Sequence, residues 1–376
     1  MKEVIGDWLR RRFSDPQAVI LAILLVAGFA TVVVAGEMLA PLLASIVIAY
    51  LLEGPIGKLE RMGAPRLLVV VLVLMLFMVF LSVLFFGLLP TIWQQMADLF
   101  QELPAYISRG QQALMELPAR YPFISEAQLK ELITMIRTEL GGLGQHLLSL
   151  SVSSLTGGIT LLIYLILVPV LVFFLLKDKE HILEWIKGYL PRQRTLLTEV
   201  WEELDHQLGN YVRGKFWEIV IVAAASYLLF TVMGLKYAAL LAMLVGFSVL
   251  VPYIGAAVVT IPVAVVGYFQ WGLDSQFAWL MIAYAILQAL DGNVLVPLLF
   301  SGVVNLHPVA IIAAVLFFGG IWGFWGVFFA IPLATLVSAV LRAWPTHGEE
   351  EGGPQDSVKK PASASSRGKP CDRPSS

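Results

Sequence analysis

Charged residues are scarce in this chain. Of its 376 residues, 14% are Asp, Glu, Lys or Arg, whereas soluble domains carry about 25%, and its hydrophobic fraction is 58%. A core surrounded by water could not bury that much apolar surface, so we expect an integral membrane protein. The net charge is −2. A chain so close to neutrality has no overall field that would recruit nucleic acid, and we expect no nucleic-acid partner.

Cysteine and the common catalytic motifs are also scarce or missing. The single cysteine, Cys371, excludes an intramolecular disulfide, and the five histidines lack the spacing of metal ligands. The sequence contains no P-loop, no G-x-S-x-G and no H-E-x-x-H. The first apolar run starts at Ala18 and is too long for a signal peptide. We therefore expect a protein that is not an enzyme and that needs neither a cofactor nor a metal.

Long apolar runs are what the sequence has in abundance. A helix crosses the hydrocarbon core, about 30 Å thick, with about 20 apolar residues. Counting each long run once gives an all-α membrane protein with about eight transmembrane helices. The runs cover residues 18–36, 38–52, 67–92, 153–176, 216–235, 238–271, 277–300 and 308–341.

Polar stretches between these runs divide the chain into segments. The predicted order is a cytoplasmic N-terminus (1–17), N-terminal transmembrane helices (18–92), an extracytoplasmic amphipathic helical segment (93–152), a transmembrane helix (153–176), a cytoplasmic amphipathic helical segment (177–215), a C-terminal transmembrane core with interrupted helices (216–342) and a disordered cytoplasmic tail (343–376). With the N-terminus inside, 20 of the 25 Lys and Arg residues lie in cytoplasmic segments. This bias predicts that both termini are cytoplasmic in a bacterial inner (plasma) membrane.

Two of the apolar runs are too long to be single straight helices. Residues 238–271 and 308–341 each hold 34 residues without a charge, which would extend about 51 Å as helix. Each is either a bent span or a re-entrant hairpin. Interrupted helices expose main-chain groups that can bind a polar solute, although Pro and Gly also serve simple close packing in membranes. The residues expected to shape the broken backbone are Pro252, Tyr253, Gly255, Pro297, Gly323, Gly326 and Pro332.

Asp291 stands out because a carboxylate inside an apolar run is costly. It needs a partner or a wet cavity, which predicts an ion- or substrate-binding group, with Gln288 one turn before it and Asn293 after it. The alternative is a helix end at the membrane interface. Asn305 and His307 precede the last run, and His307 could titrate near neutral pH or simply mark the interface.

A cluster of charges precedes the run at 216–235. Arg213, Gly214 and Glu218 are placed at the cytoplasmic edge, with Glu218 one turn inside its helix and paired with Lys215 as a structural ion pair. Arg213 and Lys215 are expected to extend their charged ends toward lipid phosphates.

Several stretches of the C-terminal half together form a specific pattern: Asn210–Gly214, Val251–Gly255, Leu290–Pro297, Asn305–Pro308, Gly319–Gly326 and Ile331–Pro332. Through these stretches the chain resembles the AI-2E family of permeases, and within it the PerM-type branch. The resemblance covers roughly residues 15–342. It implies eight spans with an extended loop between the third and fourth, and a homo-oligomer, for which a pentamer is one form. It also implies export of autoinducer-2 or sodium/proton antiport as activities of the family.

Together the residues and the resemblance predict a permease or secondary transporter that moves a small solute or ion, with lipid and that solute as its partners. Two alternatives remain open: a passive channel, and a scaffold that docks other proteins through 93–152 and 177–215. The sequence does not define the substrate, the direction of transport or the coupling ion.

Overall fold

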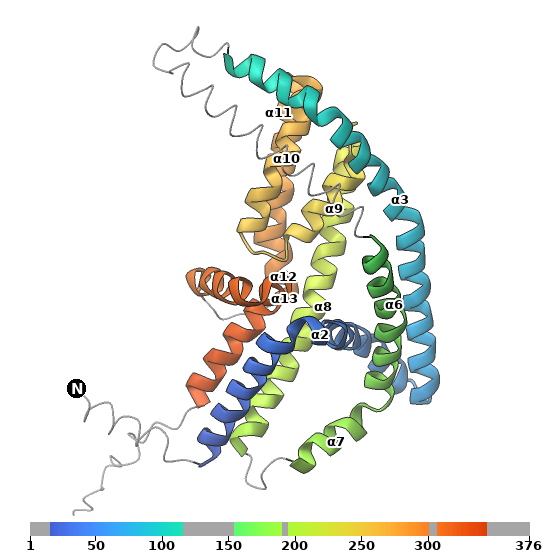
Figure 1. Cartoon of the computed structure of the whole chain (residues 1–376), viewed down its shortest axis with the longest axis vertical. Helices are drawn as coiled ribbons and strands as arrows, with labels where there is room; N and C mark the ends of the chain where they lie inside the picture. Colours follow the sequence, from blue (N-terminus) through green and yellow to red (C-terminus); the bar gives the residue numbers. More distant parts are fainter. Residues whose placement is uncertain (1–15, 116–153, 190–194, 301–306, 344–376) are drawn as a thin grey trace, which may run out of the picture.

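The computed structural model describes residues 16–115, 154–189, 195–300 and 307–343. Within these ranges the chain is helical and contains no strand, as the sequence predicts. Most of the predicted extracytoplasmic segment and the C-terminal tail lie outside the described residues. The described ends of the chain, in α2 and α13, lie toward one end of the molecule, and the loop between α10 and α11 lies at the other (Figure 1).

The N-terminal part is built from three long helices and one short one. Helix α2 (Pro16–Arg61) changes direction near its middle, and α3 (Arg66–Met115) runs along most of the molecule. Helix α6 (Ser154–Lys177) lies beside both and is followed by the short amphipathic α7 (Lys179–Tyr189). A cluster of buried aliphatic residues joins α2, α3 and α6: Leu52, Ile56, Val69, Val70, Val73, Val172 and Leu176.

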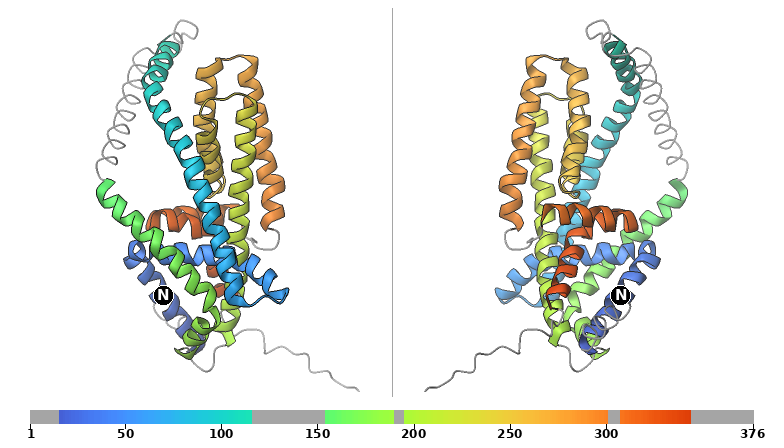
Figure 2. Two further views of the ribbon diagram at one scale, coloured as in Figure 1. Left: turned by 90° about the vertical axis from the view of Figure 1, so that its right-hand side faces the viewer. Right: turned by 90° about the vertical axis from the view of Figure 1, so that its left-hand side faces the viewer.

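The C-terminal part is arranged around α8 (Thr195–Val232). Helices α9 (Ala238–Ser248), α10 (Ile254–Trp271) and α11 (Ser275–Leu290) follow as antiparallel neighbours. A π-helical turn, η1 (Asp291–Leu295), leads into α12 (Val296–Phe300), and α13 (Pro308–Ala343) ends the described chain. Figure 2 shows α8 to α11 side by side in one bundle, with α13 crossing below it.

Six helices of the described ranges are long and apolar enough to cross a membrane. The shorter apolar helix α9 (Ala238–Ser248) and the apolar stretch Ile163–Lys177 of α6 accompany them. Little of the longest apolar stretch is covered by protein: 17% of its most apolar window, in α3, is buried. The remaining apolar side chains need a non-aqueous surrounding, which makes the chain a multi-pass membrane protein.

Two predicted segment boundaries fall inside continuous helices. Helix α3 passes through 92 and 93, and α8 passes through 215 and 216. Glu218 therefore lies in the middle of α8, and the expectation that it sits one turn inside its helix is wrong. The sequence suggested a boundary because charged residues at 195–215 precede the apolar run. Both stretches belong to the same helix, and neighbouring helices cover part of its charged half.

Candidate functional site

The first long apolar run forms a helical hairpin whose tip packs against the protein through the buried Val249 and Leu250. Helix α9 has 11 residues, about 16 Å, which is too short to cross a membrane. Both ends of the run lie together, because the Lys236 backbone N–H donates to Gln270 Oε1 at 2.8 Å. The run is thus a re-entrant hairpin rather than a bent span.

The tip of this hairpin occurs at the Pro-Tyr-Ile-Gly stretch that the sequence singles out. Tyr253 adopts a left-handed conformation (φ 63°), which is rare for a residue with a side chain. Gly255 lies so close to the Ser248 carbonyl that a Cβ at position 255 would overlap it. Pro252, Tyr253 and Gly255 therefore do interrupt the helix, and the tip is tightly built.

The second long run is broken at Gly323. That residue has φ 58° and ψ −133°, and it separates α13 into two arms. The arms meet closely beyond the break, because a Cβ at Gly326 would overlap the Phe318 carbonyl. Ala314, Val315 and Ala330 from the two arms are buried in one cluster. Gly323 and Gly326 thus shape the broken backbone as predicted.

Helix α8 joins both broken elements through one face. Tyr211, Lys215 and Glu218 are spaced at i, i+4 and i+7 and so share that face. The Tyr211 hydroxyl donates to the Phe328 carbonyl in α13 at 2.9 Å, and Lys215 Nζ donates to the Val249 carbonyl at the hairpin tip at 2.7 Å. We call this region the α8 junction: Tyr211, Lys215, Glu218, Val249, Asp291, Phe300 and Phe328.

Pro332 explains why a carbonyl of α13 is free to accept a hydrogen bond from Tyr211. A proline has no backbone N–H, so the carbonyl four residues earlier, that of Phe328, lacks its helical donor. The buried Tyr211 hydroxyl supplies that donor. Pro332 was expected from sequence to break the backbone, but α13 stays helical there and its break lies at Gly323; the contact instead ties the second arm of α13 to α8.

Lys215 and Glu218 form a buried ion pair at the junction. Lys215 Nζ lies 2.7 Å from Glu218 Oε2, and the residues are 4% and 2% exposed. The ammonium also lies 5.4 Å from the centre of the Phe300 ring. The predicted pair is confirmed. The expectation that Lys215 reaches lipid phosphates is wrong, because Glu218 of the same helix, Val249 at the hairpin tip and Phe300 of α12 surround its ammonium.

Asp291 adds a second carboxylate to the junction. It opens the π-helical turn η1, and its charge interacts electrostatically with Lys215 and Glu218. Its Oδ1 atom is buried and has no hydrogen-bond partner among the described residues. Lys215 pairs with Glu218, and Asp291 adds a second negative charge near that pair. The Asp291 Oδ1 atom remains available to a proton, a cation or a solute.

The other predicted binding residues lie around or away from this point. Gln288 Nε2 donates to the Tyr284 hydroxyl at 2.8 Å, and Asn293 Nδ2 donates to the Ala289 carbonyl at 2.8 Å, both within their own helical stretch. His307 is exposed at the start of α13, where its Nδ1 accepts from the Val309 N–H. Asn305 lies outside the described residues.

The remaining predicted residues have structural contacts. Arg213 donates to the Asn210 side chain at 2.9 Å, and Pro297 is exposed on α12. Gly214 permits the approach of Phe300, since a Cβ there would lie 2.7 Å from the ring. The sequence alone missed Tyr211 and Phe300 as members of the site. The sequence signal for this region was the Lys-x-x-Glu spacing of Lys215 and Glu218 beside an apolar run.

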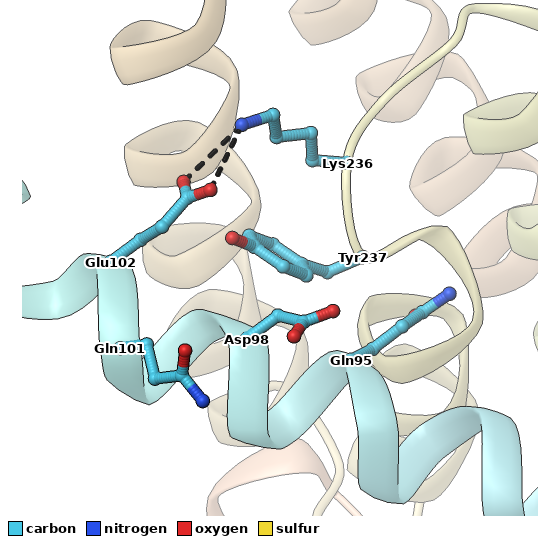
Figure 3. A pocket seen from close by; sticks show the side chains of 6 residues that line it. All are labelled: Gln95, Asp98, Gln101, Glu102, Lys236 and Tyr237. Atoms are coloured by element: carbon cyan, nitrogen blue, oxygen red, sulfur yellow. Dashed lines mark hydrogen bonds and ion pairs between the residues drawn. The ribbon is translucent and has the colours of Figure 1, made fainter.

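A separate polar pocket opens at the α10–α11 end of the molecule, between α3 and the turn before α9 (Figure 3). Lys236 Nζ pairs there with Glu102 at 3.1 Å, and Gln95 Oε1 accepts from the Leu240 N–H at the start of α9. Burial raises the pKa of the Tyr237 phenol. The lining residues are Gln95, Asp98, Gln101, Glu102, Lys236 and Tyr237.

No described residues form a cluster of three or more His, Cys, Asp or Glu side chains suited to a metal ion. The chemistry of the α8 junction is therefore that of charged side chains and main-chain carbonyls at helix breaks, an arrangement that can bind and release a small ion or polar solute.

Comparison with known proteins gives consistent similarities. A family model described as "AI-2E family transporter" matches residues 18–346. "Putative permease PerM" of Escherichia coli (strain K12) is 48% identical over 346 residues, covering 92% of this chain and 98% of that protein. "Putative transport protein YueF" of Bacillus subtilis (strain 168) is 28% identical, covering 78% of this chain and 80% of that protein.

Proposed function

The chain belongs to the AI-2E family of transporters, and on that premise we propose that it is a secondary transporter that moves a small solute or ion through the α8 junction. The observation that carries the proposal is the meeting of two broken hairpins on one charged face of α8. Main-chain carbonyls at helix breaks and an intramembrane carboxylate are the groups that transporters use to hold substrates and coupling ions.

Asp291 is the residue to which we assign the coupling cation, a proton or sodium. Its buried Oδ1 has no hydrogen-bond donor within the described part of the chain, and Lys215 is already paired with Glu218. A cation that binds there would neutralise the excess carboxylate, and its release would restore the charge. Either change alters the forces on the hairpin tip, since the Val249 carbonyl is held by the same Lys215.

We place the protein in the bacterial inner membrane with both termini cytoplasmic. The basic residues support this orientation, because 20 of 25 lie in the segments on that side. The described ends of α2 and α13 lie toward the same end of the molecule, in agreement with it. We further propose a homo-oligomer, which the family resemblance implies, with a pentamer as one form.

Flux into proteoliposomes tests the proposal. Purified protein is reconstituted, proton and sodium gradients are imposed, and internal pH and sodium are followed for wild type and Asp291→Asn. Asp274→Asn is the control, because Asp274 is an exposed residue between α10 and α11. We expect saturable, gradient-dependent flux that is lost in Asp291→Asn and kept in Asp274→Asn.

Other outcomes identify the rival functions. Flux that never saturates and never accumulates an ion against a gradient indicates a channel. Equal flux in wild type and Asp291→Asn leaves a transporter but removes Asp291 from its coupling site.

A further inference from the structure

The surroundings of Lys215 Nζ are those of a monovalent cation site. A carboxylate oxygen of Glu218 and the main-chain carbonyl of Val249 each lie 2.7 Å away, and the face of Phe300 lies 5.4 Å away. Oxygen ligands of this kind, at the end of a short helix inside the membrane, are those that bind sodium in transporters, and aromatic faces attract cations as well.

Val249 is the carbonyl that the hairpin tip leaves for a cation. It is the C-cap of α9, where the helix dipole is negative. The neighbouring carbonyls of Phe247, Ser248 and Val251 accept backbone N–H groups at the tip. The Val249 carbonyl instead accepts from Lys215. The tip thus presents the Val249 oxygen, and the Lys215 ammonium occupies the position in front of it.

The negative charge at this position favours a positive partner whether or not a lysine is present. Glu218 is 2% exposed, and the charge of Asp291 acts on both members of the pair. Without the ammonium, the buried Glu218 carboxylate would lose its partner. A proton or a small monovalent cation can neutralise it, and only the cation also fills the position in front of the Val249 carbonyl oxygen.

We propose that the ammonium of Lys215 occupies a built-in sodium site formed by Glu218 and the Val249 carbonyl, with the charge of Asp291 nearby. The consequence rests on the proposed function: with Lys215 in the sodium site, the coupling cation at Asp291 is the proton. The site itself is a property of the folded protein, and it can be tested without any measurement of transport.

Thermal unfolding of purified protein provides the test. Each variant is measured in sodium chloride and in choline chloride of equal ionic strength, over a range of concentrations. Lys215→Met keeps most of the side-chain volume and removes the ammonium, so we expect sodium to raise its Tm saturably by at least about 2 °C over choline. Wild type is expected to show no difference between the two salts.

Two further variants define the site. Lys215→Met/Glu218→Gln removes the buried carboxylate as well and is expected to lose the sodium response. Lys177→Met removes an exposed lysine at the end of α6 and is expected to behave as wild type.

The proposal is overturned if Lys215→Met, purified in sodium chloride, shows no sodium-specific rise in Tm. A rise of equal size in wild type also overturns it, because the site would then be open with Lys215 in place. If Lys215→Met does not fold, the wild-type protein decides: a saturable sodium effect that Glu218→Gln abolishes contradicts the proposal, and equal unfolding in both salts supports it. Loss of flux affects none of these results, so failure of the proposed function is distinguished from failure of this inference.

Discussion

At the scale of single residues, Pro332 leaves a helix carbonyl free, and Tyr211 of another helix donates a hydrogen bond to it. Pro332 leaves the Phe328 carbonyl without a helical donor, and the buried Tyr211 hydroxyl, 2.9 Å away, takes that place. A buried carbonyl without a donor is destabilising. Tyr211 therefore stabilises the packing of the second arm of α13 against α8.

Tyr211→Phe should lower stability because it leaves the Phe328 carbonyl unsatisfied. We expect a loss of about 1–3 kcal/mol in the free energy of unfolding, measured by thermal unfolding in detergent. Tyr189→Phe, at a residue that is 76% exposed on α7, is the matched control and should change little. An equal effect in both variants would mean that the Phe328 contact does not contribute to stability.

At the residue scale, the sequence identifies a side chain that conflicts with its surroundings. Asp291 interrupts an apolar run, and among the described residues its buried Oδ1 has no hydrogen-bond partner; its binding role stays a prediction. The burial of Lys215 was not predicted, because it depends on Val249 and Phe300, which come from other elements. Sequence spacing predicts the i, i+3 pair of Lys215 and Glu218, but it cannot predict the contacts of Lys215 with Val249 and Phe300.

At the scale of elements, close packing of main chains holds the hairpins. Gly246 of α9 approaches α8 so closely that a Cβ there would lie 2.6 Å from the Ala223 Cβ, and Gly255 lies against the Ser248 carbonyl. The break positions were predictable from Pro and Gly. Whether the first run re-enters was not, because that depends on the ties between Lys236, Gln270 and Gly234 across the ends of the run.

Gly255→Ala should destabilise the first hairpin, because its methyl group would overlap a backbone carbonyl that cannot move aside freely. We expect a loss of at least about 1–3 kcal/mol in unfolding free energy. Gly87→Ala in α3 is the control, since a Cβ there meets nothing within 4 Å. It should be neutral or stabilising by up to about 1 kcal/mol. Equal tolerance at both positions would contradict the tight tip.

Arg66 joins three helices at the α7 end of the molecule. Its guanidinium donates to the Leu176 carbonyl at the end of α6, with Nη2 at 2.7 Å, and pairs with Glu60 at 3.2 Å. Arg66→Met should cost about 1.5–3 kcal/mol, because a carbonyl of the last turn loses a charged donor. Arg109→Met, at an exposed position of α3, should cost much less in the same unfolding measurement.

At the scale of the whole molecule, the fold combines a scaffold of long helices with two broken hairpins that meet on α8. The helical class and the apolar character follow from composition. The count of spans does not, because α9, with 11 residues, is shorter than the membrane-spanning run predicted from hydropathy. The orientation from basic residues remains a prediction.

Labelling of single cysteines tests that orientation. In a Cys371→Ser background, Leu273→Cys lies in the loop between α10 and α11 and Met62→Cys lies between α2 and α3; the wild-type residues are 84% and 81% exposed. A thiol reagent that does not cross membranes should label Leu273→Cys in intact cells and Met62→Cys only after permeabilisation. The reverse pattern would invert the proposed topology.

The central claim is that solute or ion passes through the α8 junction, and a chemical block beside Asp291 tests it most directly. Gly292 has open space where a side chain would begin, so Gly292→Cys in the Cys371→Ser background should fold. Proton and sodium flux into proteoliposomes would be measured before and after a charged, reversible thiol reagent, with Leu273→Cys as the distant control. We predict that the reagent stops flux in Gly292→Cys, that reductant restores it, and that Leu273→Cys is unaffected. Complete labelling of Gly292→Cys with unchanged flux would exclude passage through the α8 junction.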